Sequence, residues 1–415
     1  MTVAGNRSIV EVMNEEDAFR PPAMSYAALF LRFLRFGALA FGGPVAQIAM
    51  VRRELVDQER WISSGRFNRL LAVMQALPGP EAHELCVHLG IRARGRIGGL
   101  LAGLGFMLPG FVLMTLAAWA YFRFGVDRGP AVAALIGAQA AVVALIARAA
   151  HRIGEHVLID RWLWIIGGAA GAATLLAVPF WIVLPAGAAV YALARAGRSK
   201  AAAVVLIAAA IVAAVWTVSA DVAVTGPAPT GPSPRVEAGW PVLFLFGLKA
   251  GLLTFGGAYT AIPFVRQDVV GRGWLDDGTF LDGVALSNVM PAPLIIFTTF
   301  AGYAVGGFAG AVAITAGVFL PAFAFSMVFY DRLEAVVSDV RVRAALDGVA
   351  AAVVGVIAAT VISLAMSLHD PANPAVAPFA IAAGSLAALY AFRSHYAAPI
   401  VLLGAGLAGL LLSRL

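Results

Sequence analysis

Two cations lie deep inside apolar stretches of the sequence, each at the same distance from a glycine pair. Arg35 precedes Gly42-Gly43 by seven residues, and Lys249 precedes Gly256-Gly257 by seven residues. Seven residues are close to two turns of an α-helix, so each cation shares a helical face with its glycine pair. A cation in hydrocarbon is costly and usually faces a bundle interior or an aqueous cavity. We therefore expect Arg35 and Lys249 to attract an anion. The alternative is that their side chains extend toward the lipid headgroups.

The glycine pairs also predict breaks in the helices that carry them. The half-helix after each break begins with free N–H groups and partial positive charge, which suits an anion. Prolines predict a second break in each half, at Pro78-Gly79-Pro80 and Pro291-Ala292-Pro293. Gln75 and Asn288, three residues before these prolines, could donate side-chain hydrogen bonds. Close helix packing by the glycines and simple proline kinks are the alternatives without a ligand.

An acidic and histidine-containing cluster follows the first of these proline motifs. Glu81, Glu84 and His88 are spaced by three and four residues, so they line one helical face. Intramembrane Glu and His side chains are candidates for gating or for coupling transport to protons, and pairing with the arginines of 92–96 is the structural alternative. His83 and His88 are five residues apart and point in different directions on a helix, so no metal site is expected.

The composition places these residues in a membrane. Of 415 residues, 61% are hydrophobic and 13% are charged, whereas a soluble domain has roughly 45–50% apolar and about 25% charged residues. This excludes a water-soluble enzyme, a disordered chain and a nucleic-acid-binding protein. The net charge of +6 comes from cation clusters between apolar runs, as the positive-inside rule requires. A single cysteine permits no internal disulfide.

Apolar runs of membrane-spanning length divide the chain into about 13 helical segments. The predicted organisation is a polar tail (1–23), a first membrane repeat (24–221), a linker rich in Gly and Pro (222–239) and a second membrane repeat (240–415). The arginines around Arg148, Arg152 and Arg161 are interpreted as a solvated cytoplasmic connection.

An internal repeat is the clearest organisational feature. Phe41-Gly42-Gly43 recurs as Phe255-Gly256-Gly257, and the proline motifs recur at nearly the same offset. Seven segments precede the linker, and an odd number would invert the second half. The cations also crowd different connections in the two halves, so we expect an inverted repeat. The ionisable cluster of Glu81, Glu84 and His88 has apolar residues at its equivalent positions in the second repeat.

These motifs resemble those of the chromate ion transporter family. The stretches that carry the resemblance are FGGPVAQIAMVRRELV, ERWIS, ALPGPEAHELCVHLG and FGGAYTAIPFVRQDVV. The resemblance covers about residues 26–415 and is closest to the long, two-domain form. It implies efflux of chromate, with sulfate as a similar competitor, and oppositely oriented halves. The second half departs from the pattern of the first at Ala258 and Ala292.

The sequence thus predicts an all-α integral membrane protein of the bacterial inner membrane that exports a tetrahedral oxyanion by alternating access. The predicted substrate-binding residues are Arg35, Gly42, Gly43, Gln75, Lys249, Gly256, Gly257 and Asn288. No cofactor, metal or nucleic acid is expected, and the oligomeric state, including a homodimer, stays open. A channel with the same anion filter and an intramembrane enzyme using Glu81, Glu84 and His88 are the alternatives.

Overall fold

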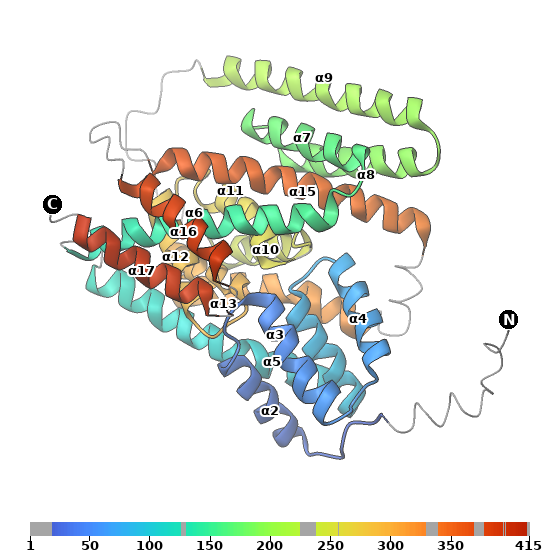
Figure 1. The fold of residues 1–415 in the computed structure, drawn as a ribbon, viewed down its shortest axis with the longest axis vertical. Coiled ribbons are helices and arrows are strands. Elements are labelled where there is room, and N and C mark those ends of the chain that lie inside the picture. The colour runs from blue at the N-terminus through green and yellow to red at the C-terminus, as the bar shows by residue number, and fades with distance from the viewer. Residues whose placement is uncertain are drawn as a thin grey trace.

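The computed structural model describes residues 19–125, 130–224, 238–255, 257–328, 339–368, 377–392, 394 and 396–412. Most of the predicted tail and residues 225–237 of the predicted linker lie outside this part. Within it, all regular elements are helices (Figure 1), which confirms the predicted all-α class. Five helices are long and apolar enough to cross a membrane, and shorter apolar helices accompany them.

The N-terminal half contains nine of the helical elements described. They are α2 (Tyr26–Ala38), α3 (Gly43–Val51), η1 (Arg52–Gln58), α4 (Ser64–Ala76), α5 (Glu81–Phe124), α6 (Pro130–Val157), α7 (Arg161–Leu175), α8 (Phe180–Arg195) and α9 (Ser199–Val224). Because α9 continues to Val224, the first residues of the predicted linker are helical.

The C-terminal half repeats this order in the described residues, without a counterpart of α9. Its elements are α10 (Trp240–Leu252), η2 (Ala258–Ala261), α11 (Ile262–Val269), α12 (Asp277–Val289), η3 (Leu294–Ile296), α13 (Phe297–Val328), α15 (Val340–Ser367), α16 (Ala377–Ala391) and α17 (Ala397–Leu412).

The predicted breaks are present in both halves. The glycine motifs separate α2 from α3 and α10 from η2, and the proline motifs separate α4 from α5 and α12 from η3. The two loops formed by the proline motifs bond to the other half of the chain. The Gly79 amide donates to the Thr254 carbonyl (2.8 Å), and the Gln47 side chain donates to the Ala292 carbonyl (3.0 Å). The breaks of both halves therefore meet at the centre of the molecule.

Helices α5 and α13 each fold back on themselves. The backbone leaves the helical region at Arg94-Gly95 in α5 and at Gly306-Gly307 in α13. A methyl group on Gly90 would lie 2.5 Å from the Gly98 carbonyl oxygen, although a straight helix would separate these residues by about 12 Å. The first part of each helix is thus a short re-entrant segment that packs against the longer part that follows.

Helices α6 and α15 occupy equivalent positions in the repeat. The sequence AALIGAQAAVVALIA of α6 aligns with AALDGVAAAVVGVIA of α15 at a constant offset, so Gly137 corresponds to Gly348. Helix α6 packs on α16 and α17, and α15 packs on their counterparts α7 and α8. A methyl group on Gly137 would lie 2.1 Å from the Ala405 carbonyl oxygen, and one on Gly348 would lie 2.3 Å from the Gly187 carbonyl oxygen. The two halves are therefore interlocked.

The directions of α6 and α15 show that the halves are inverted. Asp160 follows the C-terminal end of α6 and accepts a hydrogen bond from the Tyr191 hydroxyl (2.7 Å). Gly348, in the third turn of α15, lies directly against Tyr191. The end of α6 and the start of α15 are thus at the same end of the molecule, and the two equivalent helices run in opposite directions (Figure 1).

Reciprocal contacts between the halves show the pseudo-two-fold relation independently. Gly79 lies beside Ala322, and Ala292 lies beside Gly110. Because Gly79 corresponds to Ala292 and Gly110 to Ala322 in the repeat, these are the same contact made twice. Such reciprocity is the signature of a two-fold interface.

Charge is distributed unequally between the two ends of the molecule. One end, here called the cation-rich end, holds the end of α6, the start of α7, the turn between α8 and α9 and the start of α15. Cations at this end are Arg152, Arg161, Arg195, Arg198, Lys200, Arg341 and Arg343. The turn from Leu175 to Pro179 at the opposite end carries no charge.

Candidate anion site

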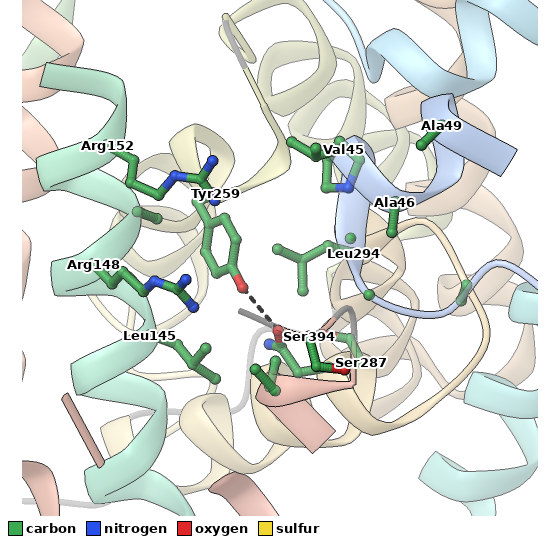
Figure 2. A pocket seen from close by; sticks show the side chains of 18 of the residues that line it. Val45, Ala46, Ala49, Leu145, Arg148, Arg152, Tyr259, Ser287, Leu294 and Ser394 are labelled. Carbon is green, nitrogen blue, oxygen red and sulfur yellow. Dashed lines mark hydrogen bonds between the residues drawn. The ribbon is translucent and has the colours of Figure 1, made fainter. Parts of the chain in front are cut away.

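A cavity of about 620 Å³ opens beside α6. Its walls come from the start of α3, the C-terminal half of α6, η2, the end of α12, the second proline motif and the segment between α16 and α17 (Figure 2). We call it the α6 cavity; the residues used below are Gly42, Gly43, Val45, Ala49, Leu145, Arg148, Ala149, Arg152, Glu155, Tyr259, Ser287, Asn288, Ala292, Leu294, Tyr390 and Ala398.

The broken first helix directs the start of α3 into this cavity. Gly42 and Gly43 adopt positive φ angles of 89° and 78°, which side chains disfavour, so the chain can turn sharply before α3 begins. The turn is anchored by Gln47, a buried side chain that donates to the carbonyls of Ala40 and Ala292 (both 3.0 Å). The first turn of α3, whose Gly43 and Val45 carry N–H groups, therefore borders the cavity.

Two arginines of α6 supply the positive charge. Arg148 and Arg152 are four residues apart, so both extend from one face of α6 into the cavity (Figure 2). The Arg148 guanidinium lies 5.8 Å from the Tyr390 ring centre, and its Nε has no hydrogen-bond partner among the described residues. Within the described part of the chain, neither arginine forms an ion pair with a carboxylate. Their charge is available to a ligand.

Polar groups from the second half complete the lining. The Tyr259 hydroxyl donates to Asn288 Oδ1 (2.8 Å), and Asn288 Nδ2 donates to the Val284 carbonyl (2.9 Å). The Ser287 hydroxyl is nearby but donates to the same carbonyl (2.7 Å). The Tyr259 ring is drawn beside the two arginines, and Val45 and Ala46 of α3 lie on the opposite side of the cavity (Figure 2). The cavity thus joins cations of one half to hydrogen-bonding groups of the other.

The arginines correct one interpretation of the sequence. Arg148 lies within the continuous helix α6 and lines a cavity, whereas the sequence analysis placed it and Arg152 in a solvated connection. Helix α6 continues through these arginines to Val157, because the stretch after Arg148 contains no proline. The signal in the sequence was the four-residue spacing of two arginines at the end of an apolar run.

Arg35 and Lys249 do not line the α6 cavity. Arg35 forms an ion pair with Glu54, and Lys249 forms the equivalent pair with Asp268. After each break the chain turns back along the helix that carries the cation. The carboxylate nineteen residues after the cation therefore lies within hydrogen-bonding distance of it. Both charges are therefore neutralised within their own half.

The remaining predicted binding residues are divided among three places. Gly42, Gly43 and Asn288 line the α6 cavity. Gly256 lies outside the described residues, and Gly257 is described but does not line the cavity. Gln75, the counterpart of Asn288, instead forms a hydrogen bond with Glu81.

The predicted gating residues lie in the re-entrant part of α5, away from this cavity. Glu81, Glu84 and His88 are all buried there. Both carboxylate oxygens of Glu84 lack hydrogen-bond partners among the described residues, and Oε1 lies against Gly79. The neighbouring His83 ring packs 4.8 Å from the Phe319 ring, in the second half. The cluster therefore lies at the contact between the halves. Among the described residues, no group of three potential metal ligands is found.

Comparisons with known proteins agree with the repeat. The family model described as chromate transporter matches residues 27–193 and again residues 242–410. A chromate transport protein of Pseudomonas aeruginosa is 60% identical over 94% of this chain and 93% of its own. The chromate transport protein of Cupriavidus metallidurans is 32% identical over 94% of both chains, and a probable chromate transport protein of Synechococcus elongatus is 28% identical over 94% of this chain and 96% of its own. No solved structure matches the chain.

Proposed function

From the premise that the chain belongs to the chromate transporter family, we propose that it exports chromate through the α6 cavity by alternating access. The observation that carries this proposal is the pair of arginines, Arg148 and Arg152, which face the start of α3 in one cavity and form no ion pair among the described residues. Chromate is a tetrahedral dianion, and charge-assisted hydrogen bonds from guanidinium groups are the strong contacts for such oxyanions. Sulfate has the same shape and charge and would compete.

The roles within the site follow from the chemistry of each group. Arg148 and Arg152 neutralise the two charges, and the N–H groups at the start of α3 donate to the remaining oxygens. Asn288, held by the Tyr259 hydroxyl, adds a neutral N–H donor from the other half, because only one of its two amide hydrogens is used by the Val284 carbonyl. A ligand bound between α6 and Tyr259 would therefore contact both halves, so its binding would be coupled to their relative movement.

The charge distribution supports export as the direction of transport. Cytoplasmic connections of membrane proteins are enriched in Lys and Arg, so the cation-rich end would face the cytoplasm of a cell whose inner membrane holds this protein. The α6 cavity extends toward that end, since it includes Glu155 in the last turn of α6. A dianion leaving an inside-negative cell gains about 4.6 kcal/mol per 100 mV, because each charge contributes about 2.3 kcal/mol. Export could run on this potential.

Glu81, Glu84 and His88 are proposed as a gate or proton-coupling group at the contact between halves. Their burial beside the Gly79 loop means that any movement of the halves would change their surroundings. No catalytic role is assigned to them, since the relatives are named as transport proteins.

Transport of labelled chromate into proteoliposomes tests the proposal. With an imposed potential, inside-out protein should take up chromate with saturation, and excess sulfate should reduce the rate. The Arg148→Ala variant should lose about 1.5–3 kcal/mol of binding, the value of a hydrogen bond to a charged group, and so weaken chromate binding about ten- to a hundredfold. Arg161→Ala, at the start of α7 outside the cavity, is the matched control. Saturable transport that is equal in both variants would contradict the site.

A further inference from the structure

A second, smaller cavity lies beside α15 in the C-terminal half. Its volume is about 280 Å³, and its walls come from α11, the C-terminal half of α15 and the connection between α7 and α8. We call it the α15 cavity; the lining residues used here are Phe180, Pro263, Arg266, Val356, Thr360 and Ser363.

The α15 cavity is the repeat-related counterpart of the α6 cavity. Leu145, Ala149 and Arg152 of α6 correspond to Val356, Thr360 and Ser363 of α15, and each set lines its own cavity. Two further pairs behave in the same way: Ala49 and Pro263 are equivalent in the first broken helix, and Ala398 and Phe180 are equivalent at the start of the last repeated helix. Agreement over helices from three parts of the repeat is a property of the fold rather than of one local contact.

The two cavities extend toward opposite ends of the molecule. Both are lined by the C-terminal half of their long helix, and those helices are antiparallel. The α15 cavity also includes Thr174 in the last turn of α7, and Ala177 and Val178 of the uncharged turn opposite the cation-rich end. The α6 cavity therefore extends to the proposed cytoplasmic side and the α15 cavity to the external side.

The α15 cavity stops short of the centre of the molecule. The α6 cavity reaches the loop at Gly42–Gly43 and the proline motif at Ala292, but the equivalent Gly257 and Gly79 do not line the α15 cavity. Phe180 occupies the position of the small Ala398. Its ring packs 5.4 Å from the Phe264 ring and 4.9 Å from the Lys249 ammonium, so it fills the inner end. Of these two repeat-related cavities, the α6 cavity is deep and the α15 cavity is shallow, as expected of a carrier open to one side.

We propose that the α15 cavity is the release site for the oxyanion, which deepens to the centre when the α6 cavity closes. This inference rests on the proposed transport function. In the opposite state each half adopts the conformation that the other half has here. Gln75, Gly79 and Glu81, the equivalents of Asn288, Ala292 and Leu294, then line the deepened cavity.

The chemistry of the α15 cavity suits release of a dianion. The equivalents of Arg148 and Arg152 are Ala359 and Ser363, so α15 contributes no cation at these positions. Arg266 lines this cavity, but Asp277 binds its guanidinium through two hydrogen bonds of 2.6 and 2.8 Å. Opening would also bring the Glu81 carboxyl group toward the ligand. A dianion held by two free arginines on one side would thus meet a site of lower positive charge on the other.

The matched positions Ala149 and Thr360 allow a direct test by thiol labelling. Single cysteines are introduced as Ala149→Cys and Thr360→Cys in a Cys86→Ala background, and full-length protein in oriented vesicles is treated with a membrane-impermeant maleimide. We expect the Ala149→Cys thiol to react only from the cytoplasmic side and the Thr360→Cys thiol only from the external side. Chromate at roughly ten times its Kd should slow labelling of the first about tenfold, because only ligand-free protein reacts.

Adding Phe180→Ala to the Thr360→Cys protein should speed its labelling, since it removes the ring that fills the α15 cavity. Phe180→Leu, which keeps an apolar side chain of substantial volume, is the control. Reaction of both thiols from one side, in protein that transports chromate, would overturn the release site while leaving the transport function intact. Reaction from opposite sides in protein that moves no chromate would instead support the two cavities and contradict the proposed function.

Discussion

The α6 and α15 cavities have the same architecture and different chemistry. In each, the C-terminal half of a long helix faces a broken helix of its own repeat. The α6 cavity carries two free arginines where the α15 cavity has Ala359 beside it and Ser363 in its wall. The repeat therefore presents the same scaffold twice, whereas the arginine pair on the long helix is present once. Under the proposed function, the α6 cavity would capture the anion and the α15 cavity would release it.

The largest effect should come from making the α6 cavity chemically like its counterpart. The double variant Arg148→Ala/Arg152→Ser removes two charge-assisted contacts, each worth about 1.5–3 kcal/mol, so chromate affinity should fall at least about a hundredfold. Titration calorimetry on purified protein measures this. Arg195→Ala, which removes a cation from the same end outside the cavity, is the control. An affinity within threefold of the wild type would remove the arginines from the site.

Exchanging Ala398 for the larger residue at the equivalent position of the α15 cavity should have the next largest effect. Ala398→Phe places at the α6 cavity the side chain that its equivalent, Phe180, places at the α15 cavity. The ring would fill space that the anion needs, and overpacking costs about 1–3 kcal/mol, so transport should fall about tenfold. Chromate uptake and thermal unfolding are measured together. Ala398→Ser, which changes little volume, should retain transport; equal loss in both would show that size is not the cause.

Glu84→Gln tests the second asymmetry between the halves, since the residue equivalent to Glu84 is Phe297. The amide keeps the shape of the carboxyl group but cannot exchange a proton. If Glu84 couples transport to protons, the variant should transport chromate at a rate within a few fold of the wild type at fixed potential, but lose its response to an imposed pH gradient. Chromate uptake with the potential clamped and the pH gradient varied measures both. A pH response equal to that of the wild type would exclude Glu84 from the coupling.

The smallest effects should come from the repeated ion pairs. Arg35 is 55% exposed and Lys249 only 26%, and Asp268 is more buried than Glu54. Arg35→Ala should therefore cost at most about 1 kcal/mol of stability. Lys249→Ala should cost more, because it leaves a buried carboxylate without its partner. Thermal unfolding in detergent ranks the two. A loss of chromate affinity in either variant, with stability unchanged, would restore these cations to the binding site.

Local patterns in the sequence were enough to predict the helices and the places where they break. The glycine and proline motifs predict the interruptions after Ala38, Leu252, Ala76 and Val289, because paired glycines permit positive φ and paired prolines remove backbone donors. The repeat could be recognised in the sequence because these glycine and proline motifs recur at nearly the same offset. The ion pairs were not predicted, although both partners were aligned in the repeat, because a pairing across nineteen residues depends on how the chain returns after the break.

What the sequence by itself determined was therefore the membrane-embedded helical class, the duplication and the places where helices break. These depend on composition and on neighbouring residues. Only the tertiary structure decided which cations stay free. Arg35 and Lys249 form ion pairs with carboxylates, whereas Arg148 and Arg152 line a cavity. The ion pairs form when the chain returns past its own broken helix, and the cavity forms only where the two halves pack together, so neither can be read from neighbouring residues.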